Sequence, residues 1–458
     1  MILDIKKITS KFTRAKEKAI NNDISVLLSI TTDIQLNFNS LFDLNLNDCK
    51  EKIYWSKPSE KFEFISWGSI LNLNADENEI NSRLNSTINN HVQCNLSKNK
   101  NIPMFIGGQN FDINTENKNI WRDFPRIDYK IPLVIIVNQI ETHSITFNFI
   151  INKNSDKYKI LNAIKNISEQ IDNYSHTNKK KEKNDIISNK ISLDKKEFLE
   201  RFFKIKSCIK SSRIEKAVIS DFVVYSINKD FPFINFLMKL KHIFPECVIF
   251  LYDYGEKGKY LGASPEKIFS LKNKQIEIDA LAGSVNRKNE KLDSNANIEY
   301  ILNDEKINDE HDIVIKDIVE SLDKLKLKLN ISKKRVLKLK NIIHLKTVIK
   351  SNVKNFTSPF DILNLLSPTA ALSGYPKKDS IDFINSIETY DRGWYTGAIG
   401  WIDSKFNCNF YAGLRSMYIC KNKLYIYGGA GITKDSDEIE EWDEVLYKIN
   451  TIEQLING

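Results

Sequence analysis

Glycine is scarce in this chain, with 16 among 458 residues, and the six cysteines are scattered. No two cysteines form a C-x-x-C pair, which argues against a zinc site or a disulfide framework and fits a reducing compartment. No run of 18 apolar residues is present, which excludes a transmembrane helix. The first residues lack a signal-peptide pattern, so we expect a cytoplasmic protein.

The composition is that of a folded, basic protein. Hydrophobic residues make up 41% of the chain, which allows a large core, and the net charge is +8. A net positive charge of this size can favour binding to nucleic acid or to a membrane surface. Lysine, asparagine and isoleucine are abundant throughout, however, so compositional bias explains the charge better, and the one dense basic run (179–183) is expected to be an exposed loop. We expect neither nucleic acid nor a membrane as a partner.

The order of predicted elements indicates an α+β protein in which antiparallel strands dominate and helices flank them. A polar, basic stretch at 173–192 separates an N-terminal part, residues 1–192, from residues 193–458, and fits a mobile linker or an inserted loop. The remaining elements follow from periodicity and turn residues. They are strands at 62–67, 131–137 and from 216 onward, helices at 194–210 and 304–328, hairpins around 255–258 and 272–274, and antiparallel strands over 396–428.

A glycine-rich stretch at 427–431 is expected to form a turn that leads into an acidic helix. Its glycines, Gly429 and Gly431, would let backbone N–H groups approach a ligand closely. Ser436 is the predicted N-cap of the helix. This turn is therefore a candidate binding site for an anion.

The acidic helix carries Glu441, Glu444 and Lys448 on one face, because they are spaced three and four residues apart. The two acids flank the apolar stripe of the helix instead of lying opposite it. Taken alone, the pattern fits either a metal site or a solvated acidic face.

Two further acids stand beside apolar runs. Glu310 lies one turn before Val314 at the edge of an apolar helix stripe, where a buried carboxylate needs a partner or a metal. Taken alone, it is more simply an acid near a helix N-terminus. Glu266 follows a proline in a turn at a strand end, where apolar walls would raise its pKa and make it a general acid. The alternative is an ordinary exposed turn glutamate.

Three basic side chains lie in strand-like runs. Lys216 begins an apolar strand and would be a general base if it faced inward, although a surface lysine is the commoner case. His344 is by default a core histidine. Arg415 is expected in a strand, either exposed or placed to bind a carboxylate through two hydrogen bonds.

Read in order, these residues belong to a series of short motifs that closely resembles the chorismate-utilising enzymes. That family includes isochorismate, salicylate, anthranilate and aminodeoxychorismate synthases. The resemblance runs from about residue 195 to the end and implies a single large domain of antiparallel sheets packed as a sandwich. The motifs are Lys216-Ala-Val-Ile, Leu261-Gly-Ala-Ser-Pro-Glu266, Ala280-Leu-Ala-Gly-Ser284, Asp309-Glu-His311, His344-Leu, Pro368-Thr-Ala-Ala-Leu-Ser-Gly374, Arg392-Gly-Trp-Tyr-Thr-Gly397, Leu414-Arg-Ser, Gly429-Ala-Gly-Ile and Glu441-Trp-Asp-Glu444.

The resemblance implies a role for each candidate. Glu310 and Glu444 would hold Mg²⁺ directly and Glu441 through water, and the metal would bind the ring carboxylate of chorismate. Lys216 would activate a water at C2, and Glu266 would protonate the departing C4 hydroxyl. The other residues of the expected substrate pocket are Gly283, Ser284, His344, Ala371, Tyr395, Arg415, Gly431 and Lys448.

Within the family, the motifs favour an isochorismate synthase. Lys216 suits water as the nucleophile, and Ala371 stands where ammonia-using members tend to carry threonine, so no glutaminase subunit is expected. Two departures are Ser367, in place of a histidine found in some members, and Ile307, in place of a polar residue.

Several alternatives remain open at this point. They are a salicylate synthase, an anthranilate or aminodeoxychorismate synthase component, and a catalytically silent or basic surface-binding protein. The pathway also stays open among menaquinone, siderophore and salicylate synthesis.

Overall fold

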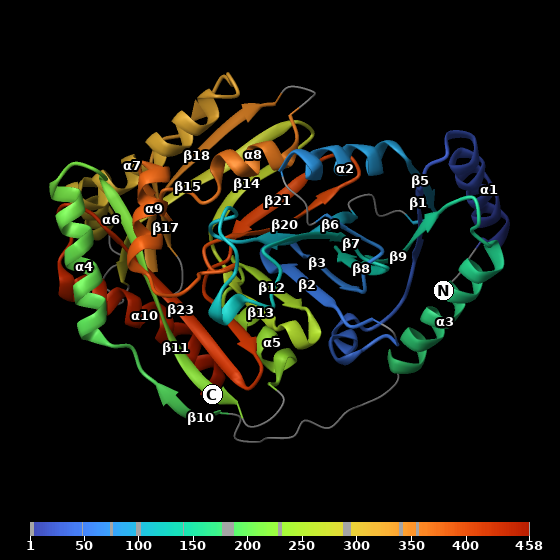
Figure 1. Cartoon of the computed structure of the whole chain (residues 1–458), viewed down its shortest axis with the longest axis horizontal. Helices are drawn as coiled ribbons and strands as arrows, with labels where there is room; N and C mark the ends of the chain where they lie inside the picture. Colours follow the sequence, from blue (N-terminus) through green and yellow to red (C-terminus); the bar gives the residue numbers. More distant parts are fainter. Residues whose placement is uncertain are drawn as a thin grey trace.

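The computed structural model describes residues 4–47, 49–73, 77–97, 102–140, 142–175, 187–227, 231–286, 295–338, 342–353 and 357–457. Within these residues the chain forms two large β-sheets with helices on their outer faces (Figure 1). Almost all neighbouring strands are antiparallel, and β1 and β5 form a parallel pair. The predicted α+β class is confirmed.

The first sheet is the longer of the two and contains both the early strands and the C-terminal hairpin. Its spatial order is β10 (Ile187–Ile191), β11 (Lys216–Ile227), β23 (Lys423–Ile432), β22 (Ser416–Cys420), β13 (Lys259–Ser264), β12 (Val248–Asp253), β2 (Lys52–Lys57), β3 (Phe62–Trp67), β8 (Val134–Gln139), β9 (Thr142–Ile151), β1 (Val26–Asp33) and β5 (His91–Asn95), with β19 (Gly374–Tyr375) paired to β11.

The second sheet is built mainly from the second half of the chain. Its order is β16 (Asn330–Ile331), β18 (Ile342–Asn352), β15 (Gln275–Asn286), β14 (Lys267–Lys272), β21 (Cys408–Ala412), β20 (Ala398–Asp403), β6 (Pro103–Gln109), β7 (Ile127–Ile131) and β4 (Leu71–Leu73), with β17 (Arg335–Lys338) paired to β18.

An aromatic core lies between the two sheets. Trp55 of the first sheet meets Tyr411 of the second edge-to-face at 5.8 Å between ring centroids, and Phe62 meets Trp401 at 5.7 Å. All four side chains belong to one buried cluster. The sheets therefore pack face to face, as the expected sandwich requires.

Helices cover the outer face of each sheet with their apolar stripes. The first sheet is covered by α1 (Ile5–Asn22), α3 (Lys157–Ser175), α4 (Lys195–Lys210), α5 (Phe233–Ile243), α9 (Lys377–Ile387) and α10 (Glu438–Asn457). The second sheet is covered by α2 (Glu77–Asn89), α7 (Glu305–Asp323) and α8 (Pro359–Leu366), and α6 (Asn295–Asn303) packs on α7.

Three predicted elements differ from the structure. The single strand expected at 131–137 is two strands in different sheets, because Pro132 interrupts the ladder where it has no N–H to donate. Helix α7 ends at Asp323, several residues early, and Lys326 beyond it adopts φ +50°. The glycine-rich stretch 427–431 is not a turn but part of strand β23.

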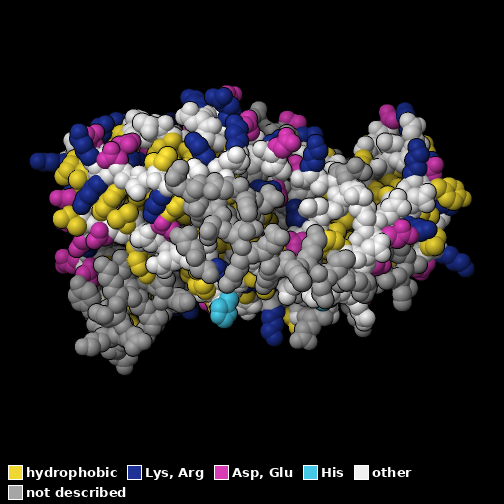
Figure 2. Space-filling model, turned by 90° about the horizontal axis from the view of Figure 1, so that it is seen from below, with side chains coloured by type: hydrophobic (Ala, Val, Ile, Leu, Met, Phe, Trp, Pro, Cys, Tyr) yellow, Lys and Arg dark blue, Asp and Glu magenta, His cyan; other side chains and the backbone are white. Residues whose placement is uncertain are grey.

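The polar stretch at 173–192 is only partly described. Helix α3 reaches Ser175 and β10 begins at Ile187, while the basic run 179–183 lies outside the described residues. All six cysteines are free thiols, as expected. On the described part of the face in Figure 2, lysine and arginine side chains are interspersed with acidic ones. No helix within the described ranges has the length and apolar character needed to cross a membrane.

Candidate active site

Strands β11 and β23 pair along their length and form one wall of a pocket. Gly431 lies opposite Val218, and Gly429 lies opposite Ser220. A Cβ atom on Gly431 would come within 2.8 Å of both Lys216 Cε and Glu310 Oε1. The missing side chain therefore leaves the space through which Lys216 reaches Glu310.

Lys216 is the first residue of β11 and is fully buried. Its Nζ donates a hydrogen bond to Glu310 Oε1 at 2.8 Å, across the gap between the first sheet and helix α7. Burial alone would raise the pKa of Glu310, but the Lys216 ammonium holds that pKa below its usual range. The inward orientation proposed for Lys216 is confirmed, and Glu310 carries a negative charge inside the protein.

Helix α10 is capped by Asp437, not by Ser436 as the sequence suggested. The Asp437 carboxylate accepts hydrogen bonds from the N–H groups of Ile439 and Glu440. Ser436 Oγ instead accepts from Thr433 N at 3.0 Å and so closes the loop before the helix. The reason is local: both residues are good caps, and the helix begins one residue later than its apolar pattern indicates.

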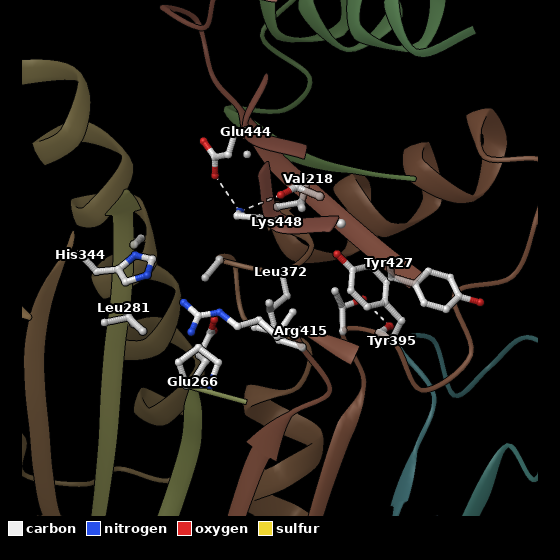
Figure 3. Close-up of a pocket in the computed structure, with 18 of the residues that line it drawn as sticks. Val218, Glu266, Leu281, His344, Leu372, Tyr395, Arg415, Tyr427, Glu444 and Lys448 are labelled. Atoms are coloured by element: carbon white, nitrogen blue, oxygen red, sulfur yellow. Dashed lines mark hydrogen bonds and ion pairs between the residues drawn. The ribbon is translucent and has the colours of Figure 1, made fainter. Parts of the chain in front are cut away.

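One face of α10 points its polar side chains at the pocket. Glu444 Oε1 lies 2.7 Å from Lys448 Nζ, and Lys448 Nζ donates to the carbonyl of Gly429 at 2.7 Å (Figure 3). Glu441 is buried and lies 3.6 Å from Lys306 Nζ of α7. Burial, reinforced by the charge of Glu444, raises the pKa of Glu441 to about 8. Carboxylates therefore crowd one end of the pocket.

These carboxylates suit a hard divalent cation by their donor chemistry. Glu310 also raises the pKa of Glu441, so the three acids interact with one another. Two of the acids are in ion pairs: Glu310 with Lys216, and Glu444 with Lys448. Among the described residues, no three acidic, histidine or cysteine side chains are already gathered into a metal-binding group. The three glutamates fit Mg²⁺ in kind and charge, and a bound cation would relieve their repulsion.

Glu266 lies between β13 and β14, directly after Pro265, and is buried. Burial raises its pKa to about 7, although the hydroxyl of Thr369, which donates to Glu266 Oε1 at 3.2 Å, acts in the opposite direction. A protonated fraction of this carboxyl is therefore present near neutral pH, unlike an ordinary exposed glutamate. This is the property that a general acid needs, and it agrees with the prediction made from the turn.

Arg415 does not lie in a strand, which corrects the prediction. It is in the connection that takes the chain from β21 in the second sheet to β22 in the first, and its φ is +45°. Figure 3 shows its guanidinium extending toward His344. Burial, together with the charges of Arg415 and Lys448, lowers the pKa of His344 to about 3, so His344 is a neutral imidazole.

These side chains line one pocket that has about 820 Å³ of empty space, part of it open to solvent. Most of the predicted site residues contribute to its lining. They are Glu266, Glu310, His344, Ala371, Tyr395, Arg415, Gly431, Glu444 and Lys448.

Four predicted residues lie outside the lining. Lys216 lies beside the missing Cβ of Gly431, and Glu441 lies one turn before Glu444 on α10, 3.6 Å from Lys306. Gly283 has φ +72° and leaves room for Ile307 of α7, with which a Cβ would collide at 2.7 Å. Ser284 pairs with His344 in the ladder between β15 and β18, and its side chain lies outside the description. That Gly283 and Ser284 contact the substrate stays a prediction.

Several lining residues were missed because they are apolar strand residues. Tyr427 stacks on Tyr395 at 4.8 Å between ring centroids. It shares a face of β23 with Gly429 and Gly431, so the period of two along the strand pointed to it. The same period links Val218 to Lys216. Leu281 and Leu372 carried no comparable signal.

The fold and this pocket define the class of protein. The chain belongs to the chorismate-binding enzyme family, whose family model matches residues 12–457.

Individual relatives agree with this assignment. The chain is 29% identical over 359 residues to the isochorismate synthase MenF of Bacillus subtilis, which covers 78% of this chain and 75% of that protein. It is 31% identical over 242 residues to MenF of Haemophilus influenzae, covering 52% and 56%. The solved structure of the menaquinone-specific isochorismate synthase MenF from Escherichia coli shares the fold, with a TM-score of 0.77 at 19% identity over 97% of this chain and 100% of that chain.

Proposed function

We propose that this protein is a Mg²⁺-dependent isochorismate synthase of the cytoplasm that acts without a glutaminase subunit. The observation that carries the proposal is a pocket that is lined by Glu266, whose pKa is raised to about 7, and by Glu310, which pairs with the buried Lys216. The relatives named as isochorismate synthases support the same reaction.

The residues of the pocket divide the reaction between them. Lys216, released from its ion pair with Glu310 and in its neutral amine form, removes a proton from the water that attacks C2 of chorismate. Glu266 gives a proton to the C4 hydroxyl, which leaves as water. One water is added and one is lost, so the net change is an isomerisation. Arg415 supplies the positive charge for the enolpyruvyl carboxylate, and Tyr395 lines the same pocket.

Glu310 and Glu444 would hold the magnesium ion directly, and Glu441 would reach it through water. When bound, Mg²⁺ would neutralise the ring carboxylate of chorismate and fix its position. Without it, Glu310 and Glu444 keep their ion pairs with Lys216 and Lys448. We therefore expect strict dependence on a divalent cation.

The test is incubation of the purified protein with chorismate, with MgCl₂ or with EDTA, followed by chromatographic separation of the products. Isochorismate should form with MgCl₂ and disappear with EDTA. Salicylate and pyruvate as main products would replace the proposal with a salicylate synthase. Unchanged chorismate in both samples would refute it.

A further inference from the structure

A buried arginine outside the pocket lining connects three separate walls of the pocket. Arg392 lies in the segment between α9 and β20, and its side chain is only 2% exposed. It donates from Nη1 to the carbonyl of Leu372 at 3.1 Å and from Nη2 to the carbonyl of Val218 at 2.5 Å. Leu372 and Val218 both line the pocket.

The third wall is the segment that contains Arg392 itself. The carbonyl of Arg392 accepts a hydrogen bond from Tyr395 N at 3.0 Å, and both Tyr395 and Thr396 line the pocket. Thr396 adopts φ +61°, which is costly for a β-branched residue and persists only where the surroundings fix the backbone. The position of Tyr395 therefore depends on contacts that hold this segment down.

The guanidinium is itself held from the other side. Glu388 accepts from Arg392 Nε at 2.8 Å and from Nη2 at 2.6 Å. The same carboxylate accepts from the N–H of Ser220 at 3.0 Å and from its Oγ at 2.9 Å, so it is fixed to β11. The face of the guanidinium lies 4.4 Å from the centre of the Phe111 ring. The planar fork of an arginine is needed to reach all of these partners together, which a lysine cannot do.

We propose that Arg392 is a positioning residue for the substrate, because its guanidinium sets the distance between the walls formed by Val218, Leu372 and Tyr395. The inference rests on the proposed function. It assigns no contact between Arg392 and chorismate.

A neighbouring ion pair offers a matched control. Arg201 of α4 pairs with Asp221 at 2.6 Å and donates to the carbonyl of Ser220 at 2.9 Å. It is also buried and also contacts β11, but neither Asp221 nor Ser220 lines the pocket. A substitution at Arg201 therefore shows how much stability is lost when a buried arginine is disturbed that holds no residue of the pocket lining.

The experiment compares Arg392→Lys and Glu388→Gln with Arg201→Lys. Melting temperature, KM and kcat are measured for each, and the chorismate Kd is measured by calorimetry in a Glu266→Gln background, where turnover does not interfere. We expect Arg392→Lys to raise KM and Kd about tenfold or more, because sub-ångström shifts of pocket walls weaken binding strongly. Arg201→Lys should lose comparable thermal stability with KM and Kd within about twofold of the wild type.

Equal shifts of Kd in Arg392→Lys and Arg201→Lys, at matched loss of stability, would overturn the inference. If Arg392→Lys does not fold, Glu388→Gln decides, because it keeps the shape of the side chain while it removes the charge and one of the two acceptor oxygens that hold Arg392. Unchanged Kd in Glu388→Gln would then overturn the inference. Failure of the proposed function is distinguishable, since the wild type itself would leave chorismate unchanged.

Discussion

At the scale of single residues, the pocket gives its carboxyl groups opposite properties through their neighbours. Glu266 is enclosed by apolar walls and a threonine, and its pKa rises to about 7. Glu310 faces a buried ammonium, and its pKa falls. One group can therefore deliver a proton at neutral pH while the other stays charged, which separates the acid from the proposed metal ligand.

The pH dependence of the reaction should report Glu266. As the acid, Glu266 is active when protonated, so the limb of kcat/KM that Glu266 controls should fall as the pH rises through about 7. Glu266→Gln should lower kcat by about 100- to 10,000-fold, because the amide cannot deliver the proton. Steady-state rates across this pH range check both points.

Thr369→Val is the companion variant for this test. It removes the hydrogen bond that favours the charged form of Glu266, so the inflection should move to higher pH. An inflection that stays in place in Thr369→Val would assign it to another group.

Lys216→Ala should also abolish most of the activity, by about 100-fold or more in kcat, because the variant has no base for the attacking water. Glu310 would lose its buried partner as well. Lys204→Ala, an exposed change on α4, is the control and should keep the wild-type rate. A rate in Lys216→Ala close to that of the wild type would refute the assigned role.

At the scale of elements, the glycines of β23 matter because strand β11 lies directly beside them. Because a glycine has no side chain, each one leaves space for a neighbouring residue. Lys216 lies in the space at Gly431, and the hydroxyl of Tyr395 lies in the space at Gly429. The sequence pointed to these glycines as important but assigned them to a ligand-binding turn. The pairing of β11 with β23 joins segments about 200 residues apart, and local patterns do not contain that information.

Gly431→Ala tests this role. The new Cβ would meet Lys216 Cε and Glu310 Oε1 at 2.8 Å, so both side chains must move. We expect the variant to keep its fold and kcat to fall about 10- to 100-fold, because a small displacement of Lys216 and Glu310 from their positions strongly reduces the rate. Gly255→Ala, whose Cβ would meet only Lys50, is the control: it should reduce stability and keep activity. Full activity in Gly431→Ala would contradict the packing described.

How far the sequence predicts the structure depends on the range of the contacts. Helix 194–210 and the hairpins at 255–258 and 272–274 follow from local patterns and are confirmed. The division of 131–137 between two sheets and the place of Arg415 at the crossing between sheets are tertiary features, and both predictions were wrong. Nine of the predicted site residues line one pocket, and their grouping followed from the family resemblance, because local patterns do not contain the long-range pairing. Their roles stay predictions.

At the scale of the whole molecule, residues 1–192 and 193–458 share one core. The aromatic cluster between the sheets takes Trp55, Phe64 and Trp121 from the first part and Trp394 and Tyr418 from the second. Trp121 stacks on Tyr418 at 4.0 Å between ring centroids. The two parts therefore cannot separate without exposing this cluster.

Unfolding should accordingly occur in one transition. Phe64→Ala should lower the free energy of unfolding by about 3–5 kcal/mol, the usual range for a buried phenylalanine, and should shift the whole transition. Phe203→Ala, at a side chain that is 54% exposed, is the matched control and should have a much smaller effect. Denaturant titration followed by tryptophan fluorescence and circular dichroism checks this; two separated transitions would contradict it.

The lining of the pocket comes entirely from residues 218–448. Among the described residues, the first part of the chain supports the pocket through Phe111, which lies against Arg392, and through Trp121, which donates to the hydroxyl of Tyr427. A substitution in the first half is therefore expected to reach the reaction indirectly, for example by moving these aromatic supports. A substitution at a lining residue of the second half would instead change the surface that faces the substrate.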